Sequence, residues 1–165
     1  MDGAPATLHG KRLVLGVTGS IAAYKAVSLL RALRSRGASV SVVMTNSATK
    51  FVAPLTFEVL SGERVTTDLF EAREEMRHLT VPEDAHAVIV APATANFLAK
   101  AAVGLADDVL STMLLTAECP LIVAPAMDGG MWEHPTVVEH VRILRARGVV
   151  VLDPDVHKRF RNSDA

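Results

Sequence analysis

Short apolar runs alternate along this chain with longer amphipathic segments. Five runs have the length and composition of strands that are buried on both faces: 13–17, 40–44, 87–91, 121–124 and 149–152. Helical periodicity fills most of the intervals between them, over 21–36, 96–104, 108–117 and 135–147. Strands that alternate with helices predict an α/β fold, a doubly wound parallel sheet in a Rossmann-like, three-layer αβα arrangement.

Three further segments complete the predicted organisation. Residues 1–10 are expected to form a flexible arm ahead of one domain that spans 11–155, and residues 156–165 follow that domain as a tail. The segment 58–79 has mixed charge and only local periodicity, so we expect a helix followed by a loop. In the first helix, Ile21 and Tyr24 are expected on the apolar face.

The composition narrows the classes of function. Half of the 165 residues are apolar and 21% are charged, which argues against a disordered chain. The net charge of −1 gives no reason to expect nucleic acid or an anionic membrane as a partner. The chain has one cysteine and no apolar stretch long enough to cross a bilayer, so we expect a cytoplasmic protein without an internal disulfide.

In a parallel sheet, ligands bind at the carboxyl ends of the strands, and two polar turns follow the first two predicted strands. The turn 18–21 contains Gly19 and Ser20, a glycine for a tight turn and a hydroxyl that can cap a helix and face a phosphate. The G-x-G-x-x-G spacing is missing, and the turn 45–47 lacks the acidic residue that a NAD-binding domain uses for ribose. A mononucleotide is therefore favoured over NAD, with an ordinary strand-to-helix turn as the alternative.

The next two predicted strands both end in Ala-Pro-Ala and lead into the polar segments 92–96 and 125–128. Thr94 and Asn96 offer a hydroxyl and an amide at the start of a helix. Simple loop and capping chemistry would also explain either segment alone. Two such loops on adjacent predicted strands favour a built site.

The histidines give little support to a metal site. None of the six forms an HxxxH or HxxE pair, so we expect no metal. His78, in Met76-Arg77-His78-Leu79, stands about ten residues before the third predicted strand. Taken alone, it is an ordinary surface histidine. A P-loop and a G-x-S-x-G nucleophile turn are both missing from the sequence.

Three motifs in order resemble those of the homo-oligomeric flavin-containing cysteine decarboxylases: 17–25, 92–96 and the P-A-M-x-x-x-M-W signature over 125–132. The resemblance covers residues 11 to 152 and is strongest to the phosphopantothenoylcysteine decarboxylases, with the peptidyl-cysteine decarboxylases as relatives. It implies a Rossmann-like flavoprotein with FMN as cofactor. It also implies a trimer or dodecamer with the flavin between subunits.

The resemblance assigns roles to individual positions. It implies that His78 is the active-site histidine. It implies FMN contacts from Gly19, Ser20, Ile21, Thr45, Phe51, Thr94, Ala95, Asn96, Phe97 and Ala126. It places substrate recognition on Met127, Asp128, Met131 and Trp132.

Two departures from the family pattern bear on the reaction. The usual residue at Asp128 is asparagine, whose amide can donate to a substrate carboxylate, whereas an ionised aspartate repels it. The tail 156–165 has Asn162-Ser163 near the place where the phosphopantothenoylcysteine enzymes carry a Cys-Gly pair on a flap, so the tail is expected to be a truncated or divergent flap.

The sequence thus leaves three functions in order of preference. The first is decarboxylation of 4'-phosphopantothenoylcysteine to 4'-phosphopantetheine, a step of coenzyme A biosynthesis. The second is oxidative decarboxylation of a peptide C-terminal cysteine to an aminoenethiol, which needs no proton from a flap cysteine. The third is a non-catalytic flavin-binding subunit.

Overall fold

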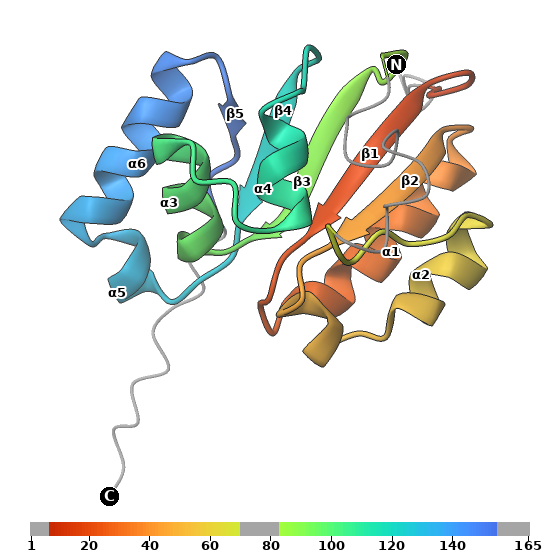
Figure 1. The fold of residues 1–165 in the computed structure, drawn as a ribbon, viewed down its shortest axis with the longest axis horizontal. Coiled ribbons are helices and arrows are strands. Elements are labelled where there is room, and N and C mark those ends of the chain that lie inside the picture. The colour runs from red at the N-terminus through yellow and green to blue at the C-terminus, as the bar shows by residue number, and fades with distance from the viewer. Residues whose placement is uncertain (1–6, 70–82, 155–165) are drawn as a thin grey trace, which may run out of the picture.

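Five parallel strands form the single sheet of this chain in a computed structural model that describes residues 7–69 and 83–154 (Figure 1). The strands pair in the order β2-β1-β3-β4-β5. Their bounds are Arg12–Val17 for β1, Ser39–Met44 for β2, Ala87–Ala93 for β3, Leu121–Pro125 for β4 and Val150–Val151 for β5. The doubly wound parallel sheet predicted from the apolar runs is confirmed.

Helices cover both faces of this sheet (Figure 1). Successive side chains of β1 point to opposite faces, so Leu13, Leu15 and Val17 join one buried cluster and Val14 joins the other. The first cluster contains residues of α1 (Ala23–Ser35) and α2 (Pro54–Ser61). The second contains residues of α3 (Ala95–Val103), α4 (Val109–Leu114) and α6 (Pro135–Ala146). The expected three layers are therefore present.

The first helix starts later than its periodicity predicts. Ser20 N–H donates to the Thr18 carbonyl, and the Ser20 carbonyl accepts from Ala23 N–H, so a turn occupies 18–22 before α1 begins. Ile21 is consequently 81% exposed and Tyr24 62% exposed. The prediction that these two side chains belong to the buried apolar face is wrong.

Two short elements and one helix start were also missed. A 3-10 helix, η1 (Ala48–Lys50), follows β2, and a one-turn helix, α5 (Gly129–Trp132), follows β4. The segment expected to begin a helix at residue 58 is helical from Pro54 because a proline fits the first helical position. That helix ends at Gly62, and Thr66 then pairs with Val43 beside β2. The rest of this segment, beyond residue 69, lies outside the described residues.

The third strand, Ala87–Ala93, is longer than the apolar run 87–91 that predicted it. Pro92 lies within β3, and the β3–β4 register shifts between Val90 and Ala93. The Pro92 carbonyl faces β1, where it accepts the Thr18 hydroxyl at 2.6 Å and the Thr18 N–H at 3.3 Å. The strand therefore extends past the end of the apolar run and carries its polar loop directly beside the end of β1.

Candidate cofactor-binding site

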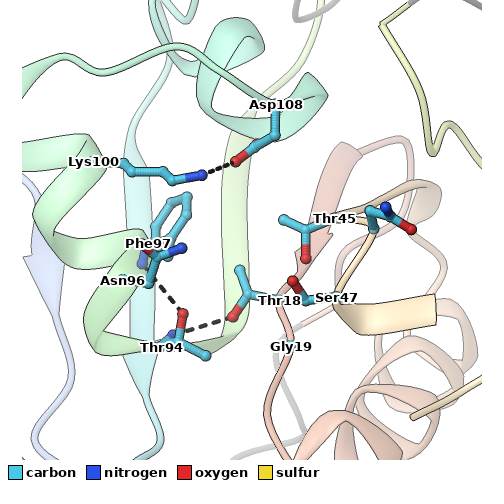
Figure 2. A pocket seen from close by; sticks show the side chains of 10 residues that line it. Thr18, Gly19, Thr45, Ser47, Thr94, Asn96, Phe97, Lys100 and Asp108 are labelled. Atoms are coloured by element: carbon cyan, nitrogen blue, oxygen red, sulfur yellow. Dashed lines mark hydrogen bonds and ion pairs between the residues drawn. The ribbon is translucent and has the colours of Figure 1, made fainter. Parts of the chain in front are cut away.

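A cavity of about 300 Å³ opens at the carboxyl ends of β1, β2 and β3 (Figure 2). The chain connections leave β1 and β3 in opposite directions here, toward β2 on one side and β4 on the other. Ligands in open α/β sheets bind at such a switch point. The described residues that line the cavity are Thr18, Gly19, Thr45, Asn46, Ser47, Thr94, Asn96, Phe97, Lys100 and Asp108.

Thr18 joins two of the loops that form this cavity. Its side chain is 2% exposed, its hydroxyl donates to the Pro92 carbonyl at 2.6 Å, and the same oxygen accepts from Thr94 N–H at 3.1 Å. A buried hydroxyl that both donates and accepts a hydrogen bond replaces the bonds it would make to water, so its burial costs little free energy. Thr18 therefore fixes the loop after β1 against the loop after β3.

Gly19 brings a third loop into contact with the first. A Cβ built on Gly19 would overlap the Ser47 Cβ and would lie 3.1 Å from the Ser47 carbonyl carbon. The turn after β1 and the segment between β2 and η1 can therefore approach this closely only because residue 19 has no side chain. Glycine here serves close packing of two cavity walls.

Backbone donors gather at the lower end of the cavity in Figure 2, around Gly19 and Thr94. Thr94 is the N-cap of α3, where its hydroxyl accepts from Phe97 N–H at 3.2 Å. The N–H groups of Ala95 and Asn96 have no acceptor inside the helix, and no described residue accepts the Gly19 N–H. Free N–H groups at a helix N-terminus suit a phosphate, so this end fits the phosphate of a mononucleotide.

The opposite end of the cavity carries an ion cluster that sequence reasoning missed. Lys100 Nζ lies 2.6 Å from Asp107 Oδ1 and 2.7 Å from Asp108 Oδ2. Burial lowers the pKa of Lys100, but the hydrogen bonds with the two carboxylates outweigh it and the net shift is upward. Burial likewise raises the pKa of Asp108, and the bond from Lys100 and the one from the Ser111 backbone more than reverse this. Lys100 and Asp108 are therefore both charged near neutral pH.

The cavity lining includes half of the residues expected to contact FMN. Gly19, Thr45, Thr94, Asn96 and Phe97 line it. The other five expected contacts, Ser20, Ile21, Phe51, Ala95 and Ala126, are not among its described lining residues.

Those five positions lie around the cavity or away from it. Ala95 opens α3, and Ser20 lies in the turn that contains Gly19, where its hydroxyl accepts from Ala22 N–H. Ala126 N–H donates to the Ala93 carbonyl, which holds the loop after β4 beside β3. Ile21 and Phe51 are exposed on the outer surface. They would reach a ligand only from outside this cavity.

The expected substrate motif lies on the neighbouring strand end. Met127 and Asp128 follow β4, and Met131 and Trp132 belong to α5. Met127 and Trp132 are partly buried against the core, whereas Met131 is 49% exposed. Asp128 is the N-cap of α5, because its Oδ1 accepts from Gly130 N–H at 2.7 Å. One carboxylate oxygen of Asp128 is thus committed to its own turn.

The expected active-site histidine, His78, and the tail 156–165 lie outside the described residues. Within the described residues, no group of three potential metal ligands comes together. None of the described helices is long and apolar enough to cross a membrane.

Several cavity residues had no assigned role in the sequence. Thr18, Asn46 and Ser47 stand in the turns that were singled out, beside the residues that were chosen. Lys100 carried a usable signal, since it is four residues after Asn96 and therefore on the same helix face. Asp108 had none, because only the fold brings the start of α4 back to α3.

The strand order 2-1-3-4-5 is the flavodoxin-like order, and the polar cavity lies at its β1/β3 switch point, where flavodoxins hold FMN. The chain belongs to the Flavoprotein family, whose model matches residues 3–164. The family resemblance read from the motifs is thereby confirmed.

Curated relatives and solved structures agree with this assignment. The chain is 51% identical over 144 residues to the coenzyme A biosynthesis bifunctional protein CoaBC of Mycolicibacterium smegmatis, covering 87% of this chain and 35% of that protein. It is 43% identical over 149 residues to the Bacillus subtilis CoaBC, covering 89% of this chain and 37% of that protein. The chain thus spans about a third of the length of these relatives.

Among solved structures, the FMN-dependent cysteine decarboxylase SpaF is 36% identical with a TM-score of 0.82, covering 90% of this chain and 87% of SpaF. A PPC decarboxylase mutant complexed with pantothenoylaminoethenethiol is 28% identical with a TM-score of 0.70, covering 86% of this chain and 81% of that one. The chain is therefore a member of the FMN-dependent cysteine decarboxylase group, and the expected flavin cofactor, FMN, is confirmed.

Proposed function

We propose that this chain decarboxylates a cysteine-terminated substrate with FMN, and that the substrate is 4'-phosphopantothenoylcysteine. The observation that carries the proposal is the cavity at the β1/β3 switch point, where the loops after β1 and β3 present free backbone donors for the FMN phosphate. The 51% identity to a coenzyme A biosynthesis protein supports this substrate. The proposed FMN-binding decarboxylase domain spans residues 11–155.

Different residues of the chain bind the phosphate, position the loops and handle the substrate proton in this proposal. The N–H groups of Gly19, Ala95 and Asn96 hold the phosphate, and Thr18 keeps their loops in register. When bound, FMN would supply reversible two-electron chemistry: it would take two electrons from the substrate cysteine before carbon dioxide leaves and return them afterwards, which gives the saturated thiol. His78 is the proposed proton acceptor for the substrate thiol or the donor that orients it.

Asp128 bears on how the substrate carboxylate is held. Its Oδ1 accepts from Gly130 N–H, and no described residue donates to its Oδ2 at the start of α5. A free carboxylate oxygen cannot donate to a substrate carboxylate, and it repels one. Asparagine in the same position would keep the Gly130 bond and turn an amide toward the substrate. We expect a weakened carboxylate interaction in this chain relative to an asparagine variant.

A second candidate is decarboxylation of a peptide C-terminal cysteine. The similarity to SpaF covers almost the whole of both chains, unlike the partial match to CoaBC. The family resemblance places Asn162-Ser163 near the Cys-Gly pair of the phosphopantothenoylcysteine enzymes, and this departure also supports a reaction that ends at the enethiol. A non-catalytic flavin-binding subunit is the third candidate.

A homo-oligomer, a trimer or a dodecamer, is part of the proposal. Large apolar side chains near the start of α1 and along η1 and α2 are more than half exposed: Ile21, Tyr24, Phe51, Leu55 and Val59. A surface of this kind is typical of a protein interface. Ile21 and Phe51, expected FMN contacts outside the cavity of one chain, could then meet a flavin held at the junction. The expected cytoplasmic location, drawn from composition, also remains part of the proposal.

Substrate turnover tests the proposed function. Purified FMN-loaded protein is incubated with 4'-phosphopantothenoylcysteine and, separately, with a cysteine-terminated peptide, and the products are weighed by mass spectrometry. Loss of carbon dioxide alone from the first substrate supports the proposal. Loss of carbon dioxide and two hydrogens from the peptide, with the first substrate unchanged, supports the second candidate. If both substrates are unchanged, the result supports the third candidate, a non-catalytic flavin-binding subunit.

A further inference from the structure

Lys100 and Asp108 line the end of the cavity that lies opposite the phosphate-binding donors, and Asp107, which is outside the lining, completes their ion cluster. Figure 2 shows Lys100 and Asp108 pointing toward each other there, with Thr94 and Gly19 at the other end. The Lys100 side chain is only 14% exposed and that of Asp108 only 21%, whereas the Asp107 side chain is 53% exposed. The Lys100–Asp108 pair is therefore shielded from solvent and held in one arrangement.

The charge of this cluster does not suit a role as a phosphate counter-ion. Lys100 is the only cation among the described residues that line the cavity. Its single positive charge is already matched by two carboxylates, both within hydrogen-bonding distance, so the cluster carries a net charge of −1. A net negative group repels the FMN phosphate, so electrostatic attraction cannot be its contribution to binding.

The position of the pair in the fold suggests a different contribution. Asp108 is the N-cap of α4, where its Oδ1 accepts from Ser111 N–H at 2.8 Å and the Ser111 hydroxyl accepts from Asp108 N–H. The body of α4 is anchored by Leu110, which packs on Gly16 of β1. The connection from 104 to 107 is exposed. The bond from Lys100 to Asp108 thus ties the start of α4 to α3 across the end of the cavity.

We propose that Lys100 is a positioning residue of the FMN site, which sets the distance between α3 and the start of α4 through its ion pair with Asp108. The cavity then has the right width for FMN before the cofactor arrives. The inference rests on FMN binding in this cavity, as in the proposed function. A counter-ion role predicts the opposite change in FMN affinity for Asp108→Asn. It also predicts that loss of Lys100 weakens the binding of FMN but not of riboflavin.

Asp108→Asn separates the two roles by sign. Asparagine is also a good N-cap, so the variant keeps α4 but loses the charge that holds Lys100. A positioning role predicts that the variant binds FMN about tenfold more weakly, a loss of about 1.4 kcal/mol. A counter-ion role predicts the reverse, since removal of a negative charge near the phosphate tightens binding. Dissociation constants come from quenching of flavin fluorescence as apoprotein is added.

Lys100→Met separates the roles by ligand. Riboflavin has the same ring and ribityl chain as FMN but no phosphate. A positioning residue shapes the cavity for both, so Lys100→Met combined with Asp108→Asn, which keeps the cluster's net charge at −1, should weaken FMN and riboflavin by the same factor, again about tenfold. A counter-ion would lose affinity for FMN only. Lys100→Arg, which restores the ion pair, should return most of the affinity and the resolved absorption bands of shielded flavin.

Two further measurements complete the test. Glu139 and Arg142 form an ion pair of similar length, 2.6 Å, on α6, exposed and outside the cavity lining, so Glu139→Gln is the matched control and should bind FMN like the wild type. Thermal unfolding of each apoprotein separates lost binding from lost folding. Wild-type protein that binds no FMN overturns the site itself. Wild-type binding with unchanged affinity in both cluster variants, or tighter binding by Asp108→Asn, overturns only the role of Lys100.

Discussion

Replacement of Gly19 by alanine tests the closest contact between two walls of the cofactor cavity. The new Cβ would overlap the Ser47 Cβ and would also lie 3.1 and 3.3 Å from the carbonyl carbon and Cα of Ser47. Two of these three atoms belong to the backbone, so no side-chain rotation relieves the clash. The segment between β2 and η1 must move away from the turn after β1, and both segments line the cavity.

The size of the effect follows from this geometry. Overpacking that forces a backbone shift costs about 1–3 kcal/mol. If the loops move apart in the apoprotein, the free-energy cost of overpacking is paid when FMN binds, and about 1.4 kcal/mol is a tenfold loss of affinity. If the loops stay in place, the same free-energy cost lowers the stability of the fold, by about 2–4 °C of melting temperature for each kcal/mol in a domain of this size. Gly19→Ala should therefore lower FMN affinity, melting temperature or both, by these amounts.

A double variant makes the reasoning specific. Ser47→Gly removes the Cβ that the new methyl group meets, and alone it should cost no more than about 1 kcal/mol. Combined with Gly19→Ala, it should return part of the lost affinity, so that the two substitutions are less harmful together than their sum. Flavin fluorescence titration and thermal unfolding of all four proteins measure this coupling. A Gly19→Ala protein with wild-type affinity and melting temperature would refute the packing argument.

The remaining predictions concern catalysis, the α5 cap and pH. His78→Asn should keep bound yellow FMN and lose decarboxylation; an active, FMN-loaded variant would remove His78 from the mechanism. Asp128→Ala should cost about 1 kcal/mol through its lost N-cap, whereas Asp128→Asn should keep the melting temperature and lower the substrate KM; an Asp128→Asn protein with the wild-type KM would contradict carboxylate repulsion. Folding lowers the pKa of Asp108, so the ionised side chain stabilises the fold above its ordinary pKa of 3.8, and this stabilisation is lost as the pH falls below that value. The stability of Asp108→Asn should therefore depend less on pH in acid. Superimposable acid unfolding curves of the variant and the wild type would contradict this.

The sheet and the phosphate-binding loops could be predicted because both depend on local sequence. Apolar runs identify buried strands, and Thr94 is a typical N-cap residue ahead of a helical period. The rule that ligands bind at strand carboxyl ends then places Gly19, Thr45 and Thr94 near one another from the sequence alone. Each of these predictions needs only the sequence within one element and the parallel order of the strands.

The missed features depend on tertiary contacts. Ile21 fits the helical period of α1, but the turn held by Ser20 uncouples it from that helix and exposes it. Pro92 continues β3, and its carbonyl accepts the hydroxyl of Thr18, which follows the end of the neighbouring strand. Asp108 is distant in the sequence from the loops after β1 and β2, and only the packing of α4 on Gly16 brings it to the cavity.

Turnover of 4'-phosphopantothenoylcysteine by the purified protein with FMN bound tests the proposed activity most directly. The flavin absorption spectrum first shows that the cofactor is present, and mass spectrometry then follows the substrate. We expect a product that has lost carbon dioxide, formed at a rate that falls in Gly19→Ala together with its FMN content. An FMN-loaded protein that leaves this substrate and a cysteine-terminated peptide both unchanged would contradict the assignment of this chain as a cysteine decarboxylase.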